Sequence, residues 1–120
     1  MNTGKKHSVV FQMNTENINE QNALMTYVTN VINHWGDDVE IHVVVHGPAI
    51  GMVRKTKTMV GEALKQAIQK GVQFFACENT IRVRQIEKSD IVDQVAFVPS
   101  GLIAIIEKQE AGWAYIKCNL

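Results

Sequence analysis

The feature that most constrains the fold of this chain is the alternation of apolar runs with helical patterns. Short apolar runs rich in β-branched residues predict strands at 8–13, 39–45, 72–76, 95–98 and 113–117. Between them, apolar residues at 3.6-residue spacing predict helices at 17–35, 59–70 and 100–111, with one or two helical turns at 79–86. Strands that are apolar on both faces are typical of a parallel sheet covered by helices. We therefore predict an α/β fold, a three-layer α/β/α sandwich with a mainly parallel sheet of about five strands.

Local signals mark where these helices begin and end. Asn17 is a good capping residue, and Glu20 stands three positions later, as in a capping box. Gly36, Gly71 and Gly112 follow the three long helices, where glycine readily adopts the left-handed conformation that ends a helix. The strand order does not follow from the pattern.

Composition narrows the class of protein. A chain of 120 residues with 46% hydrophobic and 20% charged residues is typical of one globular domain, which we place at residues 1–120. Two cysteines exclude a disulfide scaffold and a zinc site made of cysteines alone. The apolar runs are too short for a signal peptide or a membrane span, so we expect a cytoplasmic protein with reduced thiols and no membrane contact.

The balance of charge also bears on partners. Twelve Lys and Arg match twelve Asp and Glu, which argues against a nucleic-acid partner and favours self-association into a homo-oligomer. The charge is nevertheless divided, because residues 1–50 carry a net −3 and residues 51–120 a net +3. Two basic clusters, at 54–57 and 82–84, hold much of the excess. They are either solvated surfaces or a positive field beside a site, and both interpretations remain open.

Ligands of open parallel sheets bind beyond the carboxyl ends of the strands, where helix N-termini also gather. Cys77 follows the third predicted strand at that edge. A thiol at a helix start has a lowered pKa, and we expect Arg82 and Arg84 to add positive charge nearby. Cys77 is therefore the candidate catalytic residue; the alternative is a small buried side chain that ends a strand.

Other residues at this edge are candidates for ligand binding. His46 is either a proton carrier or an anchor of the Gly47-Pro48 turn, and the backbone N–H groups of Asn79 and Thr80 are possible anion donors. The full set of candidate ligand-binding residues is Asn14, His46, Gly47, Asn79, Thr80, Arg82, Pro99 and Ser100.

Several other chemistries do not fit this edge. A phosphatase loop needs Arg six positions after the cysteine, where Val83 stands, and the chain has no Cys-x-x-Cys and no glycine-rich dinucleotide fingerprint. His42 and His46 are four residues apart on a strand, about 13 Å, so they cannot share one metal ion.

We predict no metal and no cofactor, and we expect His42 to be a core histidine with one satisfied hydrogen bond. Cys118 shares the edge if the last strand is parallel, as either a resolving thiol or a bystander.

The stretch Ala76-Cys77-Glu78-Asn79-Thr80 resembles the Ala-Cys-x-Asn-Thr segment of DsrE/DsrF-like proteins. Residues 98–101, Val-Pro-Ser-Gly, resemble a second signature of that family, and residues 108–116 resemble its closing helix and strand. His46-Gly47-Pro48 matches as well, and the resemblance runs in order over residues 7–117.

This resemblance implies an α/β/α domain that forms homo- or hetero-oligomers. It also implies a function, because better-studied members carry sulfur as a persulfide on the cysteine that corresponds to Cys77. Such a sulfur-relay protein has sulfur donor and acceptor proteins as partners, and it is either a sulfurtransferase or a sulfur carrier. The alternative function is a non-catalytic small-ligand-binding or assembly module in which Cys77 is structural.

Overall fold

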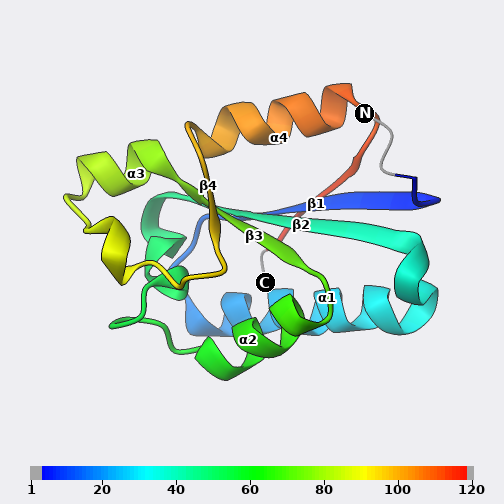
Figure 1. Ribbon diagram of the computed structural model, residues 1–120, viewed down its shortest axis with the longest axis horizontal. Coiled ribbons are helices and arrows are strands. Elements are labelled where there is room, and N and C mark those ends of the chain that lie inside the picture. The colour runs from blue at the N-terminus through cyan, green and yellow to red at the C-terminus, as the bar shows by residue number, and fades with distance from the viewer. Residues whose placement is uncertain (1–3, 119–120) are drawn as a thin grey trace.

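The computed structural model describes residues 4–118 and contains one sheet of five strands (Figure 1). All neighbouring strands pair in parallel, in the order β4-β3-β2-β1-β5. The strands are β1 (His7–Met13), β2 (Val39–Val45), β3 (Gln73–Cys77), β4 (Ala96–Val98) and β5 (Ala114–Lys117). The predicted five-stranded parallel sheet is confirmed. The strand order, which the sequence pattern did not predict, is new information from the structure.

Helices cover both faces of this sheet. The helices α1 (Ile18–Trp35) and α2 (Gly61–Gln69) lie on one face, and α4 (Gly101–Glu110) lies on the other (Figure 1). Asn17 caps α1 as predicted, since its side chain accepts hydrogen bonds from the N–H groups of Asn19 and Glu20. The three-layer α/β/α sandwich is therefore confirmed.

The segment between β2 and α2 differs from the prediction. The sequence predicted only a break at Gly47-Pro48, whereas residues Gly47–Val53 form a 3₁₀ helix, η2, and four of its seven residues are buried. Proline suits the first turn of such a helix because its N–H would have no partner there. The predicted helix at 59–70 starts later, at Gly61, and the turns predicted at 79–86 form the short helix α3 (Glu78–Val83).

Successive residues of a strand point to opposite faces of the sheet, so the core has two parts of unequal size. The larger part lies between the sheet and α1 and α2, where Phe11, Val43 and Leu64 are fully buried. The smaller part lies under α4 and centres on Val44 and Trp113. Among the described residues, α4 is the helix that covers this second face. Apolar side chains on the outer surface of α4 are exposed to solvent.

The strand order also positions the start of α4. The chain reaches β4 at one edge of the sheet and must return to the opposite edge to form β5. Because crossovers between parallel strands are right-handed, reversing direction along the sheet puts the connecting helix on the other face. The return begins immediately after β4, so the first residues of α4 lie at the carboxyl end of β3, beside Cys77.

His42 is a polar residue buried beneath the helices that cover the sheet. This histidine on β2 is 6% exposed, and its Nε2 lies 2.9 Å from Oε2 of Glu40. Its Nδ1 has no hydrogen-bond partner among residues 4–118, and burial lowers the pKa of its imidazole. It is thus the core histidine with one hydrogen bond that the sequence predicted.

Candidate functional site

The sulfur of Cys77 sits inside a group of hydrogen-bond donors. Cys77 ends β3 and directly precedes α3, and only 5% of the residue is exposed. The backbone N–H of Gly101, at the start of α4, donates to its Sγ at 3.2 Å. The hydroxyl of Thr80 and the backbone N–H groups of Asn79 and Thr80 also favour the negative charge of this sulfur and lower its pKa.

These donors decide the acidity of the thiol. Burial is the largest single effect and raises the pKa of Cys77, because it disfavours the charged thiolate. The hydrogen bonds from Thr80, Gly101 and Asn79 together outweigh burial and hold the pKa of Cys77 below its ordinary value. The thiolate is therefore stabilised by dipoles directed at the sulfur, and this is the arrangement that a nucleophilic cysteine requires.

We expected the positive charge of Arg82 and Arg84 to lower the pKa of Cys77, but it does not contribute to that pKa. Arg82 turns to the side chain of Asn79, where Nη2 donates to Oδ1 at 2.8 Å. The causes that set the pKa of Cys77 are burial and hydrogen bonds, with no contribution from Arg82 or Arg84. Arg82 thus holds the first turn of α3 in place rather than facing the sulfur.

Neighbouring strand ends hold the donors in position. The N–H of Gly47, after β2, donates to Oγ1 of Thr80 at 2.9 Å. Since that oxygen accepts from Gly47, the hydroxyl proton of Thr80 is left to point at the sulfur. The N–H of Asn79 also contacts the carbonyl oxygen of Pro99 at 3.2 Å, which ties α3 to the end of β4. Three loops therefore fix one sulfur environment.

The position of Gly101 explains why α4 can start so close to the sheet. A Cβ at this residue would lie 3.0 Å from Cβ of His46 and 3.2 Å from Cγ1 of Val44, closer than side-chain carbons normally approach. Glycine lets the N–H of the first helical residue reach Cys77. The hydroxyl of Ser100 caps the same helix and accepts from the N–H of Ile103 at 3.4 Å.

His46 packs against Gly101 and belongs to a second polar chain. Its Nε2 lies 2.9 Å from Nε2 of Gln12, and the hydroxyl of Tyr115 donates to Oε1 of Gln12. The Gln12 amide donates to the imidazole, which places the ring proton on Nδ1. Burial, followed by the charge of Lys117, lowers the pKa of His46, so the ring is neutral near pH 7.

Most of the predicted edge residues lie around Cys77, but Asn14 does not, and Arg82 donates to Asn79 instead of facing the sulfur. Hydrogen bonds connect Gly47, Asn79, Thr80 and Pro99, as described above. Asn14 follows β1, two strands away from β3, and within residues 4–118 it shares no hydrogen bond with this group. Sequence reasoning missed Gly101, although a glycine directly after a capping serine is a signal of close helix–strand approach.

Cys118 lies at the same edge but in a different environment. It follows β5, is 1% exposed, and belongs to the core under α1. Burial raises its pKa to about 11. Strands β3 and β5 are separated by two others, so the cysteines are about 14 Å apart at 4.8 Å per strand. A disulfide needs Cα atoms within about 7 Å, which removes the resolving role within one chain.

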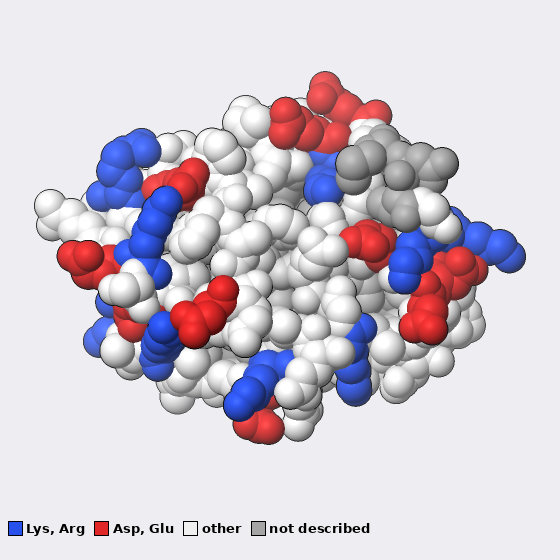
Figure 2. All heavy atoms as spheres, viewed as in Figure 1, with Lys and Arg blue, Asp and Glu red and all other residues white. Residues whose placement is uncertain are grey.

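Three further features concern metal ions, membranes and surface charge. Among residues 4–118, no group of three or more His, Cys, Asp or Glu is arranged to hold a metal ion. Within the same part of the chain, none of the helices has the length and hydropathy needed to cross a bilayer. On the face shown in Figure 2, basic and acidic side chains are interspersed around an uncharged centre.

A parallel five-stranded sandwich with an acidified cysteine between a strand and a short helix defines a class of small α/β thiol proteins. The model of the DsrE/DsrF-like family matches residues 7–118, and the chain belongs to this family. The resemblance seen in the sequence is thereby confirmed.

Solved structures agree with this assignment. MTH1491 from Methanobacterium thermoautotrophicum, a protein of unknown function, is 28% identical, with a TM-score of 0.88 over 93% of this chain and 99% of the other. BT1422 from Bacteroides thetaiotaomicron, a conserved protein of unknown function, is 19% identical with a TM-score of 0.74. That alignment covers 92% of this chain and 93% of the other, and it supports the fold alone. No curated protein matches the chain.

Proposed function

We propose that this protein carries sulfane sulfur as a persulfide on Cys77 and acts in a sulfur relay. Membership of the DsrE/DsrF-like family indicates a role related to sulfur relay. The observation that carries the specific proposal is the hydrogen bond from Gly101 to Cys77 Sγ, which together with Thr80 and Asn79 holds the pKa of a buried sulfur below its ordinary value. A purely structural cysteine has no need of donors that favour its charged form.

The transfer step follows from thiolate chemistry. The Cys77 thiolate attacks the terminal sulfur of a donor persulfide, R–S–SH, and forms a new bond from Sγ to that sulfur. The bond between the two donor sulfurs breaks, its electron pair leaves with R–S⁻, and the proton stays on the transferred sulfur. The reverse reaction with an acceptor thiolate discharges Cys77, so no external oxidant or reductant is consumed.

The same donors suit the loaded state. A persulfide is more acidic than a thiol and its terminal sulfur carries negative charge, so N–H groups and the Thr80 hydroxyl stabilise it. His46 packs against Gly101 as a neutral imidazole. Because Gln12 donates to its Nε2, the ring can accept a proton only when that hydrogen bond opens, and the transfer itself moves no proton to the protein.

Intact mass spectrometry after incubation with a low-molecular-weight persulfide tests this function. We expect wild type and Cys118→Ser to gain the mass of one sulfur atom, and Cys77→Ser to gain none. The mass gain should reverse with dithiothreitol, which separates a persulfide from oxidation to sulfinic acid. Equal loading of Cys77→Ser, or no loading of wild type, contradicts the proposal.

A specific observation favours a second function, a non-catalytic binding or assembly module. Cys77 is only 5% exposed, as a structural cysteine would be. If this alternative is right, Cys77 resists alkylation by iodoacetamide at every pH at which the protein stays folded. The sulfur-relay proposal expects alkylation whose rate rises with pH to a midpoint below that of an unfolded control peptide.

We also propose that copies of the chain associate through the outer surface of α4. Three apolar side chains there are more than two-fifths exposed: Leu102 at 58%, Ile103 at 51% and Ile106 at 42%. The zero formal charge produces no strong repulsion between copies. The short helix α3 offers only one exposed apolar side chain, Val83 at 75%, because Ile81 is 5% exposed. Light scattering should show an oligomer that Leu102→Glu converts to monomer, whereas Val83→Glu should not.

A further inference from the structure

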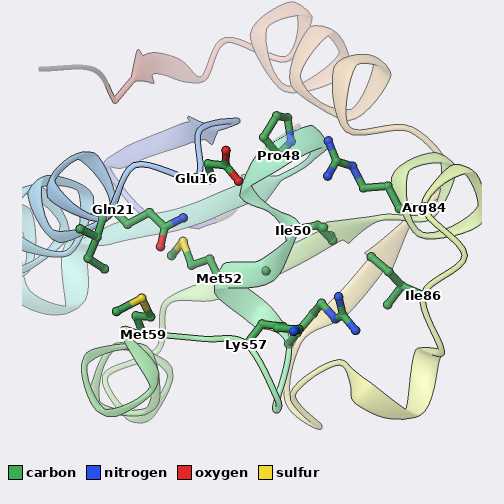
Figure 3. Close-up of a pocket in the computed structure, with 12 residues that line it drawn as sticks. Glu16, Gln21, Pro48, Ile50, Met52, Lys57, Met59, Arg84 and Ile86 are labelled. Atoms are coloured by element: carbon green, nitrogen blue, oxygen red, sulfur yellow. The ribbon is translucent and has the colours of Figure 1, made fainter.

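A cavity of about 530 Å³ lies at the carboxyl edge of the sheet, on the side of α1 and α2. Its walls come from η2, from the start of α1 and from the segment after α3, as Figure 3 shows. The volume falls within the range of about 300–1,000 Å³ that small-molecule sites occupy. Cys77 is not among its lining residues, so this cavity is distinct from the sulfur site.

The charged side chains of the cavity are mostly basic. Arg54, Lys57 and Arg84 line it, against one carboxylate, Glu16. The side chains of Lys57 and Arg84 form no ion pair within residues 4–118. In Figure 3, Arg84 extends from the end of α3 toward Pro48, and Lys57 lies across the cavity from it. Cations that converge from separate segments without counter-ions favour an anionic ligand.

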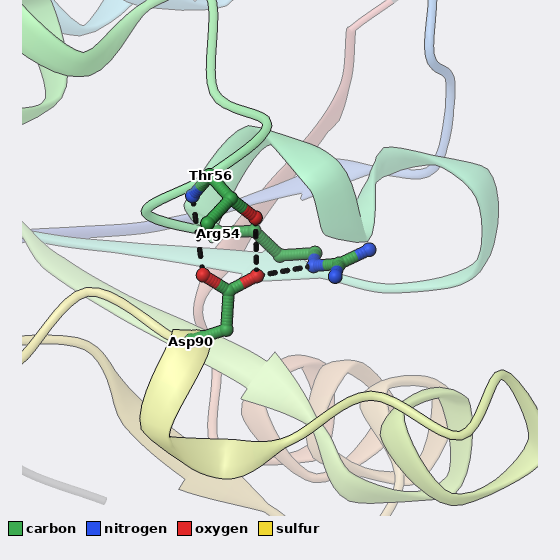
Figure 4. A network of polar contacts seen from close by, with 3 residues as sticks. All are labelled: Arg54, Thr56 and Asp90. Carbon is green, nitrogen blue, oxygen red and sulfur yellow. Dashed lines mark hydrogen bonds and ion pairs between the residues drawn. The ribbon is translucent and has the colours of Figure 1, made fainter.

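Arg54 is fixed in one orientation by a dedicated network (Figure 4). Its Nε donates to Oδ2 of Asp90 at 2.8 Å. Thr56 holds that carboxylate, with its hydroxyl 2.7 Å from Oδ2 and its backbone N–H 3.1 Å from Oδ1. Because Asp90 engages only Nε, the two Nη groups remain available, as Figure 4 shows them directed away from the carboxylate. A fixed pair of guanidinium nitrogens matches two phosphate oxygens.

The rest of the cavity wall combines apolar side chains with one uncharged polar side chain, Gln21. Ile50 and Met52 are 3% and 1% exposed and form part of the wall, with Ile86 opposite. Gln21 is 5% exposed, and its amide nitrogen donates to the carbonyl oxygen of Thr15 at 3.0 Å. Its amide oxygen has no hydrogen-bond partner in the described chain, and Figure 3 shows the side chain projecting into the cavity. A ligand with an apolar body and a hydrogen-bond donor fits these groups.

From this arrangement we propose that the cavity binds an organic phosphate monoester, with its phosphate held by Arg54, Lys57 and Arg84. The ester's apolar or aromatic body packs on Ile50 and Met52. A phosphate monoester carries close to two negative charges at pH 7. Arg54 is already paired with Asp90, so the two cations that form no ion pair among residues 4–118, Lys57 and Arg84, supply the charge that attracts it. This binding function goes beyond sulfur transfer and does not depend on it.

Isothermal titration calorimetry with three probes tests the two parts of the proposed ligand separately. Phenyl phosphate carries both the anion and the apolar body, inorganic phosphate carries only the anion, and benzyl alcohol carries only the body. We expect phenyl phosphate to bind at least about tenfold more tightly than either fragment, because bonds to charged groups and apolar burial each contribute at least the ~1.4 kcal/mol that corresponds to a factor of ten. Binding of either fragment as tight as that of phenyl phosphate overturns the proposal.

The two basic clusters of the sequence supply matched control variants. Lys57 lines the cavity, whereas Lys55 pairs with Asp93 at 2.8 Å outside it; likewise Arg84 lines the cavity and Arg82 bonds to Asn79. Lys57→Gln and Arg84→Gln should each weaken phenyl phosphate binding about tenfold, and Lys55→Gln and Arg82→Gln less than twofold. Equal effects within either pair would contradict the site, since each pair loses the same charge.

A third measurement separates this proposal from the sulfur function. Cys77→Ser should bind phenyl phosphate with unchanged affinity, because Cys77 does not line the cavity. Melting temperatures of all variants should stay near that of wild type, which shows that lost binding is not lost folding. Weaker binding by Cys77→Ser would overturn the independence of the two sites, whatever the result of persulfide loading.

Discussion

The two cysteines of this protein occupy similar places in the sheet and opposite chemical environments. Both lie at the carboxyl edge, where Cys77 ends β3 and Cys118 follows β5, and both are almost completely buried, at 5% for Cys77 and 1% for Cys118. Cys77 receives hydrogen bonds from Gly101, Asn79 and Thr80, and its pKa is lowered. Cys118 has burial alone, and its pKa rises to about 11.

This difference shows that position at the edge does not by itself activate a thiol. Cys77 also directly precedes a helix, whereas Cys118 follows the last strand and is packed in the larger core. At nearly equal burial, donors directed at the sulfur therefore determine whether the thiol or the thiolate is favoured. The predictions below test that conclusion in order of decreasing effect.

The largest effect should come from Gly101→Ala, which removes the space that lets α4 approach Cys77. The new Cβ would lie 3.0 Å from Cβ of His46, so the helix start must shift. We expect the free energy of unfolding to fall by about 1–3 kcal/mol and the pKa of Cys77 to rise, with no change at Cys118. Denaturant titration and pH-dependent alkylation measure these two quantities.

Gly51→Ala is the control for this substitution, because a Cβ there would meet only Cβ of Lys57 at an ordinary 3.8 Å. It should leave the pKa of Cys77 unchanged. A Gly101→Ala protein with wild-type stability and wild-type thiol acidity would show that the close approach of α4 is not needed.

The second prediction concerns stability at alkaline pH. The folded-state pKa of Cys118 is about 11, above its ordinary 9.0, so its contribution is fully present below pH 9 and is lost as pH rises through 11. The difference in unfolding free energy between wild type and Cys118→Ala should therefore shrink by about 2 kcal/mol from pH 9 to 11. Denaturant titrations at several pH values measure this difference.

Cys77 should change stability with the opposite sign. Its folded-state pKa is lowered, so its contribution is present above the unfolded value of 9.0 and is lost as pH falls through the folded one. The advantage of wild type over Cys77→Ala should thus grow as pH rises toward 9. Parallel pH profiles for the two alanine variants would erase the distinction between the thiols.

The smallest effect should come from Thr80→Val, which removes one donor and keeps the side-chain shape. The hydroxyl of Thr80 lowers the pKa of Cys77, so the variant should have a higher thiol pKa. We expect a loss of about 1.5 kcal/mol of thiolate stabilisation, the lower end of the range for a hydrogen bond to a charged group. Thr80→Ser keeps the hydroxyl and should titrate like wild type; a Thr80→Val protein that does so too would remove the side chain from the donor set.

The sequence predicted the sheet well because its strands and helices differ in period. The apolar run around Val43 and the helical spacing from Leu24 to Val31 leave little ambiguity about element type. Strand order was not predictable, because it depends on how whole elements pack and not on any local pattern. The 3₁₀ helix at Gly47–Val53 was also missed, since its burial comes from tertiary contacts.

The candidate site was predicted in location but not in mechanism. Cys77, Asn79 and Thr80 are neighbours in the sequence, so a strand followed by a helix was enough to bring them together. Gly101 lies 24 residues later, and its donated bond depends on the strand order. Arg84 was expected near the thiol and instead lines the second cavity, because the direction of a side chain after a short helix is set by packing.

The return of α4 across the sheet has a consequence for folding. The N–H of Gly101 reaches Cys77 only after β4 has joined the sheet and α4 has docked. A chain folded up to α3, with its last third still undocked, therefore lacks this donor, and its Cys77 is less acidic than in the native state. Thiol reactivity at neutral pH, followed during refolding, reports when the C-terminal third closes over the sheet.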